Sequence, residues 1–271
     1  MQARAKMKLL PLRKQALPIL LLSLLALQPP GAAAQPGPRL SSESGQMVQA
    51  FVSRAERSAE DRAVDVYRKP AQTLEFFGLE PNMKVIEFFP GGGYMSENIR
   101  NGLNDQGQLH LVGFAEPVAQ RLTAAGYTHV SAMPESAMAT GPSDEPGGKF
   151  TLEKFDLTVN DADMFLTFRN THNITEASRH LFHEGVFKAL RPGGIYGIVD
   201  HTKRHMDPGS PEIWRRVDPV QMIKEVEAAG FEFVDYSTLH YRPDDGLIFD
   251  STRPSLNRYS DRFTLKFRKP S

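Results

Sequence analysis

The stretch "VIEFFPGGGYMSENI", residues 85–99, decides the fold predicted for this chain. It begins inside a near-continuous apolar run, residues 83–89, which is typical of a parallel strand covered on both faces. Pro90 and the three glycines at 91–93 end this run with a turn. After the turn, apolar side chains recur every fourth residue, as on one face of a helix: Met95, Ile99 and Leu103. The stretch therefore predicts a strand, a glycine turn and a helix, which together are the opening unit of an α/β domain.

The same alternation of strand and helix continues toward the C-terminus. Strands are predicted where short apolar runs recur, at residues 108–114, 127–132, 162–168, 195–201, 231–237 and 262–269. Helices are predicted between them, at residues 115–126, 174–194 and 218–230. The last strand alternates apolar and polar side chains, which favours an antiparallel partner and one wetter face. Strands that alternate with helices predict a doubly wound α/β fold.

The segments outside this alternation define the predicted domain boundaries. Residues 35–45 are rich in Pro, Ser and Gly and indicate a flexible lead-in. Residues 46–79 show a helical pattern that stops at Gly78, so an N-terminal helical cap is expected. The α/β core then covers residues 80–271, and cap and core together form one domain, 46–271.

Three further stretches are predicted to be loops. Residues 134–149 are expected to form an exposed insertion. The loops at about 202–217 and 241–260 are long and rich in Arg, Asp and Pro. Because long loops in compact domains tend to be lids or binding loops, these two are the candidates for substrate choice.

The N-terminus predicts an export signal. Residues 1–34 contain five basic residues and no acid, followed by the apolar run "ALPILLLSLLAL". Small residues at Ala32 and Ala34 match a cleavage site, so a signal peptide over 1–34 and a periplasmic mature protein are predicted. The run is shorter than the about 20 residues of a membrane span, so no stable span is expected after cleavage. An uncleaved N-terminal anchor is the alternative.

Composition excludes several classes of protein. The chain has 271 residues, is 40% hydrophobic and 24% charged, and has a formal net charge of zero. Since residues 1–34 carry a net charge of +5 and the whole chain carries zero, the remainder carries −5, so the body is mildly acidic and no nucleic-acid partner is expected. There is no cysteine, which excludes disulfides and thiolate metal sites. The pairs His201/His205 and His180/His183 have spacings that suit a metal on a helix, but such pairs are more often surface or core histidines, and no metal is expected.

Glu87 indicates the class of ligand at the glycine turn. A carboxylate just ahead of the turn would repel a pyrophosphate. No Lys-Ser or Lys-Thr follows the glycines, which excludes a P-loop, and Ser96 stands where the dinucleotide fingerprint has its last glycine. The turn suits a ligand that is cationic or offers an amine or hydroxyls. S-adenosylmethionine has a sulfonium, an α-amine and a ribose diol, and no phosphate.

Several motifs together carry a family resemblance: "VIEFFPGGGY", "LTFRNTHNI", "ALRPGGIYGIVDH", "AAGF" and "RFTLKFRKP". With them the chain resembles the class I S-adenosylmethionine-dependent methyltransferases over roughly residues 55–270. More closely, it resembles a bacterial group of exported, predicted methyltransferases with a "PGGGY" or "PGGGW" turn. The resemblance implies a Rossmann-like sheet of seven strands, the last one antiparallel, and S-adenosylmethionine as cofactor. A small-molecule methyl acceptor is expected.

The resemblance also assigns roles to individual residues. The superfamily pattern is acid-x-Gly-x-Gly-x-Gly, and Phe89 stands at the first glycine of that pattern. The superfamily places a ribose-binding acid at the end of the second strand, where this chain offers Glu116, or Ala115 in a stricter alignment. The expected cofactor-binding residues are Glu87, Pro90, Gly91, Gly93, Tyr94, Glu116 and Arg169.

Catalysis is expected from polar residues after the fourth and fifth strands: Asn170, His172 and His201. A histidine there suits a general base, because its pKa lies near neutrality. Asp200 is expected to orient the neighbouring His201. The alternative for Asn170 and His172 is hydrogen bonding that ties down the loop.

The N-terminal cap and the function each leave two interpretations open. The charged residues Arg62, Asp65, Arg68 and Lys69 form either a solvated face or a cap that touches substrate. The chain is either a methyltransferase or a non-catalytic binding protein on a methyltransferase fold. A bulky side chain in the adenosine position favours the second function, and an open cleft lined by Glu87 favours the first. Fold alone does not decide between them.

Overall fold

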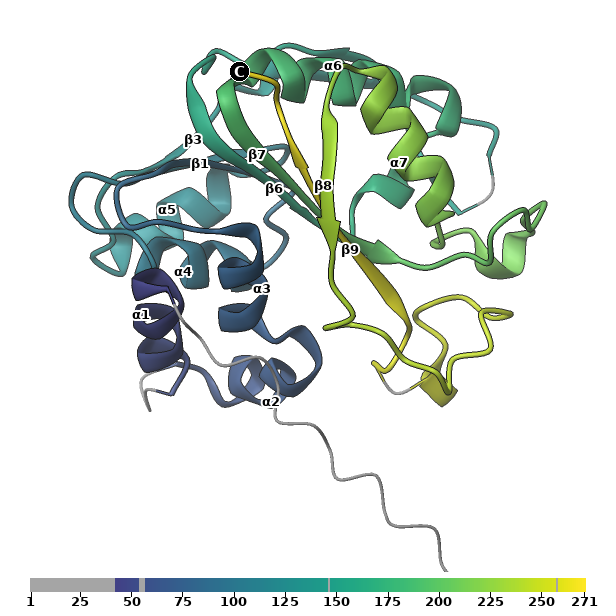
Figure 1. Ribbon diagram of the computed structural model, residues 1–271, viewed down its shortest axis with the longest axis horizontal. Helices are drawn as coiled ribbons and strands as arrows, with labels where there is room; N and C mark the ends of the chain where they lie inside the picture. The colour runs from purple at the N-terminus through teal and green to yellow at the C-terminus, as the bar shows by residue number, and fades with distance from the viewer. Residues whose placement is uncertain (1–41, 54–56, 146, 257) are drawn as a thin grey trace, which may run out of the picture. The chain divides into compact units, whose positions relative to one another are not determined.

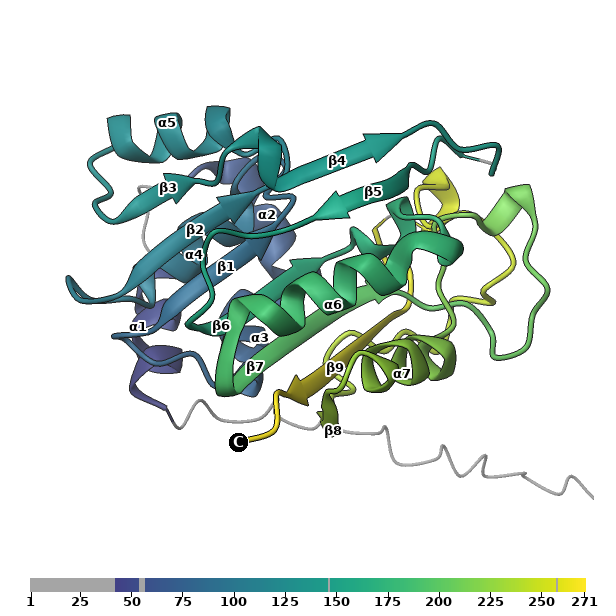
Figure 2. The same ribbon diagram turned by 90° about the horizontal axis from the view of Figure 1, so that it is seen from above.

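The computed structural model describes residues 42–53, 57–145, 147–256 and 258–271. Seven strands form one mixed sheet in the order β3-β2-β1-β6-β7-β9-β8 (Figures 1 and 2). Their bounds are β1 (Lys84–Phe88), β2 (Gln108–Val112), β3 (Val130–Ala132), β6 (Ala162–Phe168), β7 (Leu190–His201), β8 (Glu232–Tyr236) and β9 (Arg262–Arg268). The predicted doubly wound sheet is confirmed.

Strand direction in the sheet follows the prediction as well. β1 pairs in parallel with β2 and β6, and β6 pairs in parallel with β7. β9 lies between β7 and β8 and is antiparallel to both. The carboxyl ends of β1, β6 and β7 therefore meet at one edge of the sheet, where ligands of open α/β sheets bind.

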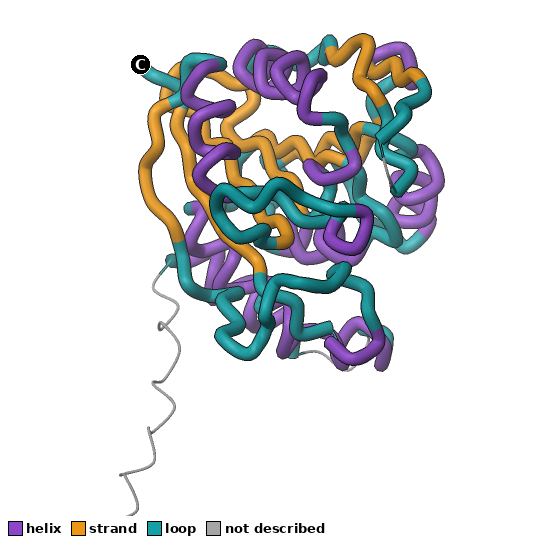
Figure 3. Tube along the Cα trace, turned by 90° about the vertical axis from the view of Figure 1, so that its right-hand side faces the viewer, coloured by secondary structure: helices purple, strands orange, loops and turns teal. Residues whose placement is uncertain are grey.

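Seven helices in the described ranges cover the two faces of the sheet (Figures 2 and 3). They are α1 (Glu43–Val52), α2 (Ala59–Arg68), α3 (Pro70–Phe77), α4 (Tyr94–Asn101), α5 (Glu116–Ala124), α6 (Arg179–Ala189) and α7 (Pro219–Ala228). Helices α6 and α7 pack on one face, and α1 to α5 pack on the other. In β1, Ile86 belongs to the first core and Val85 to the second. A strand whose successive side chains enter two cores must be apolar throughout, which explains the continuous run in the sequence.

Local signals in the sequence set several helix ends. Asp218 caps α7, because its carboxylate accepts hydrogen bonds from the backbone N–H of Val220 (2.9 Å) and Gln221 (3.4 Å). Pro219 follows at the first helical position, where its missing N–H costs nothing. Gly78 ends α3 with a φ of 83°, a left-handed conformation that glycine adopts without strain. These ends match the predicted start and stop signals.

The structure corrects the sequence-based prediction at three places. Helix α1 begins at Glu43, inside the stretch 35–45 that composition assigned to a flexible lead-in. The predicted insertion loop 134–149 contains a 3-10 turn, η1 (Glu135–Ala137), and strand β4 (Met138–Gly141). β4 pairs antiparallel with β5 (Thr151–Phe155), a strand that was not predicted. The predicted helix 174–194 ends at Ala189 in the structure. β7 begins at Leu190, because that residue already pairs with Ala162 of β6.

The reason for the missed hairpin is its short length. Strand β4 has four residues, and its side chains are half-buried or exposed, so no apolar alternation marks it. Its pairing with β5 supplies the hydrogen bonds that define it as a strand.

Four further 3-10 turns connect the elements: η2 (Thr171–Asn173), η3 (Glu176–Ser178), η4 (Pro211–Ile213) and η5 (Pro254–Leu256). No helix in the described ranges is long and apolar enough to cross a membrane. The predicted signal peptide, residues 1–34, lies outside the described residues.

Candidate active site at the glycine turn

The glycine turn joins the end of β1 to the start of α4. Gly91 and Gly93 have φ values of 57° and 81°, and Phe89 has a φ of 50°. A Cβ added to Gly91 or Gly92 would meet no atom within 4 Å, so this side of the turn is open for a ligand. A Cβ on Gly93 would lie 2.8 Å from the Val118 side chain. Gly91 therefore leaves room for a ligand, whereas Gly93 allows the turn to pack against α5.

A cavity of about 430 Å³ lies over this turn, and we call it the turn cavity. It is lined by the carboxyl ends of β1, β6 and β7 and by α2. Eight of the ten predicted site residues line it: Glu87, Pro90, Gly91, Tyr94, Arg169, Asn170, His172 and His201. Glu116 and Gly93 do not.

Glu87 lies at the base of the turn cavity as a buried carboxylate with one described partner. It is only 2% exposed, and its Oε2 accepts a hydrogen bond of 2.5 Å from the Ser96 hydroxyl. No ion pair to Glu87 is found in the described part of the chain. Burial raises the pKa of Glu87 to about 7, although the bond from Ser96 opposes this. A buried carboxylate without a cation is costly unless a ligand supplies the positive charge.

Tyr94 connects the turn to the N-terminal helical region. Its hydroxyl donates a hydrogen bond of 2.5 Å to Asp65, and Asp65 forms an ion pair of 2.6 Å with Arg57. The Arg68 guanidinium lies over the Tyr94 ring, 4.3 Å from its centre. Asp65 and Arg68 thus face the turn, while Lys69 donates to the backbone carbonyl of Leu239 at 2.8 Å. Helix α2 forms one wall of the cavity, as the cap interpretation expects.

His172 is held by the buried carboxylate of Asp200. The His172 Nδ1 lies 2.7 Å from Asp200 Oδ1, and the Thr171 hydroxyl donates to Oδ2. Asp200 is fully buried. Burial opposes its ionisation, but the charge and hydrogen bond of His172 hold the pKa of Asp200 well below its usual range. Since Nδ1 faces Asp200, Nε2 is the ring nitrogen left for the cavity, and this arrangement is typical of a general base.

His201 lies beside this pair and is buried as well. The His172 and His201 rings have their centres 5.6 Å apart, and His201 Nδ1 lies 3.0 Å from the Ser260 hydroxyl. Burial lowers the pKa of His201 well below its usual range, although Asp200 opposes the shift, so the ring is neutral at pH 7. The sequence-based prediction that Asp200 orients the His201 ring is corrected. The Asp200 carboxylate forms a hydrogen bond with the His172 ring, whereas from His201 it accepts a hydrogen bond of the backbone N–H and none of the ring.

Asn170 has a positioning role in this geometry. Its amide nitrogen donates to three backbone carbonyls, those of Phe88 (3.2 Å), Phe89 (3.0 Å) and Phe168 (3.2 Å). These bonds join the end of β1 to the end of β6. Because the amide nitrogen is engaged in these three hydrogen bonds, the alternative that Asn170 ties down the loop describes it better than a role in catalysis.

Glu116 lies at a second cavity of about 600 Å³ at the end of β2, which we call the β2 cavity. The side chain is exposed, and its Oε1 accepts a hydrogen bond of 2.9 Å from Gln120. Two phenylalanine rings, tilted by 32° to each other, separate the linings of the two cavities. Phe89 lines the turn cavity and Phe114 lines the β2 cavity, and the two ring centres are 5.5 Å apart.

Phe89 fills the space that a small residue would leave open. A Cβ on Gly113 would come within 2.1 Å of the Phe89 ring, and the ring stacks on Phe88 with centres 4.1 Å apart. A positive φ at a bulky residue is strained, which is the physical reason for glycine at this position in the superfamily pattern.

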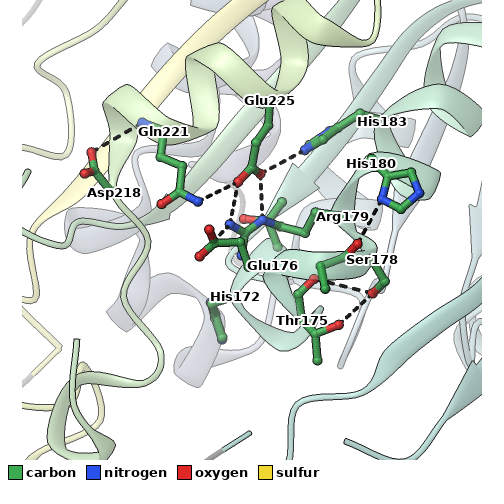
Figure 4. Close-up of polar contacts among 12 residues, drawn as sticks. His172, Thr175, Glu176, Ser178, Arg179, His180, His183, Asp218, Gln221 and Glu225 are labelled. Atoms are coloured by element: carbon green, nitrogen blue, oxygen red, sulfur yellow. Dashed lines mark hydrogen bonds and ion pairs between the residues drawn. The ribbon is translucent and has the colours of Figure 1, made fainter. Parts of the chain in front are cut away.

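The histidine pairs considered for a metal serve other contacts. His183 Nδ1 lies 3.2 Å from the Tyr196 hydroxyl, and its ring faces Glu225 rather than His180 (Figure 4). Glu225 forms a bidentate pair with Arg179, with both distances 2.7 Å, which joins α6 to α7. Within the described ranges, no group of three or more His, Asp or Glu side chains is arranged to hold a metal ion. The His183 ring therefore has a structural contact at the junction of α6 and α7.

Comparisons with known proteins agree on the fold. No family model matches the chain, and no curated protein matches it. A solved S-adenosylmethionine-dependent methyltransferase from Aquifex aeolicus matches with a TM-score of 0.53 and 14% identity, covering 83% of this chain and 97% of that one. The [4+2]-cyclase SpnF matches with a TM-score of 0.53 and 16% identity, covering 85% and 98%.

A third solved structure, an S-adenosylmethionine-dependent methyltransferase from Mesorhizobium loti, matches with a TM-score of 0.50 and 14% identity. It covers 73% of this chain and 97% of that chain. The chain thus has the Rossmann-like fold of the class I methyltransferases. Since one of these neighbours is a cyclase, the reaction has to be argued from the site.

Proposed function

We propose that the protein is an S-adenosylmethionine-dependent methyltransferase that acts on a small molecule. The observation that carries this proposal is Glu87, a buried carboxylate that forms no ion pair with any described residue, beside an open glycine turn. A cationic or amine-bearing ligand would satisfy Glu87, and the open face at Gly91 and Gly92 lets it approach the backbone closely.

The residues fit the methionine end of the cofactor well. Glu87 would hold the α-amine, and Arg169, which also lines the turn cavity, would hold the carboxylate. Glu116 and the β2 cavity lie where the adenosine end would bind, beyond the Phe89–Phe114 pair. S-adenosylmethionine supplies a methyl group on a sulfonium, and its transfer needs a nucleophile in line with the breaking carbon–sulfur bond.

His172 is the residue that would prepare the nucleophile. Its Nδ1 is held by Asp200, so Nε2 can take the proton from an acceptor hydroxyl or amine at the cavity. Asn170 keeps the ends of β1 and β6 together and so sets the distance between the turn and His172. The main contribution of the protein would be the positioning of acceptor and cofactor.

Calorimetric titration of the purified protein with S-adenosylmethionine and with its demethylated product tests the proposal. We expect both to bind, and methionine and adenosine alone to bind more weakly, because each would fill one cavity only. If neither the cofactor nor its product binds or raises the melting temperature, the proposal fails.

A non-catalytic binding protein is the second candidate, and the Phe89 ring favours it. Phe89→Gly removes this ring and restores the superfamily glycine. We expect cofactor binding to tighten about tenfold because the two cavities join, while stability falls by roughly 2–3 kcal/mol from lost packing less the relieved strain. Denaturant unfolding and calorimetry measure the two effects. A folded Phe89→Gly protein that binds the cofactor less tightly would show that the ring contacts the cofactor instead of blocking it.

Export remains part of the proposal. The basic residues and the apolar run before Ala34 support a cleaved signal and a periplasmic mature protein. Relatedness to the exported group with a "PGGGY" or "PGGGW" turn rests on the motif itself. N-terminal sequencing of the secreted protein tests cleavage after Ala34.

A further inference from the structure

A cavity of about 710 Å³ adjoins the turn cavity, and we call it the arginine cavity. Its walls are α2, the ends of β6 and β7, residues 251–254 and 258–260, and the start of β9. Arg68, Arg169 and His201 line both cavities, so the two are connected. A molecule in the arginine cavity would therefore reach the His172 side of the turn cavity.

Arginines outnumber carboxylates along the lining of this cavity. Five arginines line it, against the carboxylates of Glu60 and Asp61. Arg68, Arg169 and Arg262 form no ion pair with a carboxylate of any described residue. Arg262 donates to the backbone carbonyls of Tyr67 and Arg258, both at 3.0 Å, and its buried Nε has no hydrogen-bond partner among the described residues.

Burial makes these unpaired cations costly. Burial and the charge of Arg68 lower the pKa of Arg169 to about 10. Burial and the charge of Arg169 lower the pKa of Arg262 to about 9. Guanidinium groups that repel one another at a partly buried site destabilise the protein unless an anion lies between them.

The backbone holds Arg169 in this place despite a strained conformation. Its φ is 63°, in the left-handed region, and its N–H donates to the Val199 carbonyl at 2.7 Å. Strain of this kind at the end of a strand is typical of a functional position. Arg258, which also lines the cavity, has a φ of 67°.

We infer that the arginine cavity binds an oxyanion, and that the methyl acceptor is a small molecule with a phosphate or carboxylate group. Planar guanidinium forks match both groups in a bidentate manner. The cofactor does not meet this need, because it carries two positive charges and a single carboxylate, which Arg169 alone can bind. Arg68 and Arg262 remain for the acceptor. The identity of this anion as the acceptor rests on the proposed function, whereas anion binding rests on the cavity alone.

Titration with inorganic phosphate and with malonate, at low ionic strength and without cofactor, tests the inference. The variants are Arg68→Gln and Arg169→Gln, both half-buried, and the control is Arg268→Gln, an exposed residue at the far end of β9 that pairs with Glu232. We expect at least one anion to bind and to raise the melting temperature. We expect both test variants to bind the anion at least about tenfold more weakly than the wild type, and the control to bind it with unchanged affinity.

The anion-free melting temperature gives a second measurement. It should rise in Arg169→Gln, because one of the repelling cations is gone. Binding of phosphate only assigns a phosphoryl acceptor, and binding of malonate only assigns a carboxylate. If neither anion binds, or if both test variants bind like the wild type, the inference is overturned. Anion binding without cofactor binding would leave anion binding by the arginine cavity standing, and it would remove both the proposed function and the identity of the anion as the methyl acceptor.

Discussion

Substitution Glu87→Gln is expected to weaken S-adenosylmethionine binding by about a hundredfold while it makes the folded protein more stable. The buried carboxylate would hold the cofactor amine through a charge-assisted hydrogen bond, which the neutral amide cannot replace. Glutamine keeps the volume and can still accept the hydrogen bond from Ser96, so the fold should persist. Calorimetry measures the loss of binding.

The gain in stability has a defined pH dependence. The pKa of Glu87 is raised from 4.5 to about 7 in the folded protein. Protonation of Glu87 therefore contributes its full stabilisation of the folded protein below pH 4.5, and this contribution is lost as the pH rises through 7. Above pH 7 the wild type carries a penalty of about 3 kcal/mol that Glu87→Gln lacks. Unfolding measured at pH 5 and pH 8 should show the advantage of the variant growing with pH.

The ionisation of Glu87 should also control cofactor binding by the wild type, but affinity should rise with pH where the stability of the folded protein falls. Because the bound amine needs an ionised Glu87, affinity should fall as the pH drops below 7. Glu232→Gln is the matched control, since Glu232 is an exposed carboxylate on β8 that pairs with Arg268. Wild-type affinity in Glu87→Gln, or an equal loss in the control, would contradict the role given to Glu87.

Asp200→Asn is expected to cost roughly 3 kcal/mol of stability and to disturb the His172 ring. Asp200 Oδ1 accepts from His172 Nδ1 and from the His201 N–H, both at 2.7 Å. Oδ2 accepts from the Thr171 hydroxyl and the His172 N–H. In Asp200→Asn, an amide nitrogen at the position of Oδ1 or Oδ2 would face a backbone N–H, that of His201 or of His172. Because Asp200 is fully buried, no water can relieve this mismatch.

Two measurements separate the effect of Asp200 on stability from its effect on the His172 ring. Denaturant unfolding gives the stability loss, with Asp161→Asn as the control, because Asp161 forms an exposed pair with Lys84 and should cost less than about 1 kcal/mol. Nitrogen-15 NMR of the histidine rings reports the tautomer, which should shift at His172 toward a proton on Nε2. Cofactor binding should change little, because Asp200 does not line the turn cavity. A variant with wild-type stability and an unchanged His172 tautomer would refute this assignment.

Much of the site was visible in the sequence because it follows the ends of strands. Glu87, Arg169 and His201 each stand at the carboxyl end of a predicted strand, and parallel pairing brings these ends together. Phe89 was visible as the residue in place of a glycine. The packing of its ring against Gly113 was not, because that contact depends on how β1 and β2 pack.

The sequence by itself determined the alternation of strand and helix, the ends of α3 and α7 at Gly78 and Asp218, and the glycine turn. These features depend on residues a few positions apart, whose burial and backbone preferences form a readable pattern. Tertiary structure alone decided that Asp200 holds His172, that β4 and β5 pair, and that Arg68, Arg169 and Arg262 line one cavity. Those contacts join segments far apart in the chain, and their geometry follows from packing of whole elements, which no local pattern records.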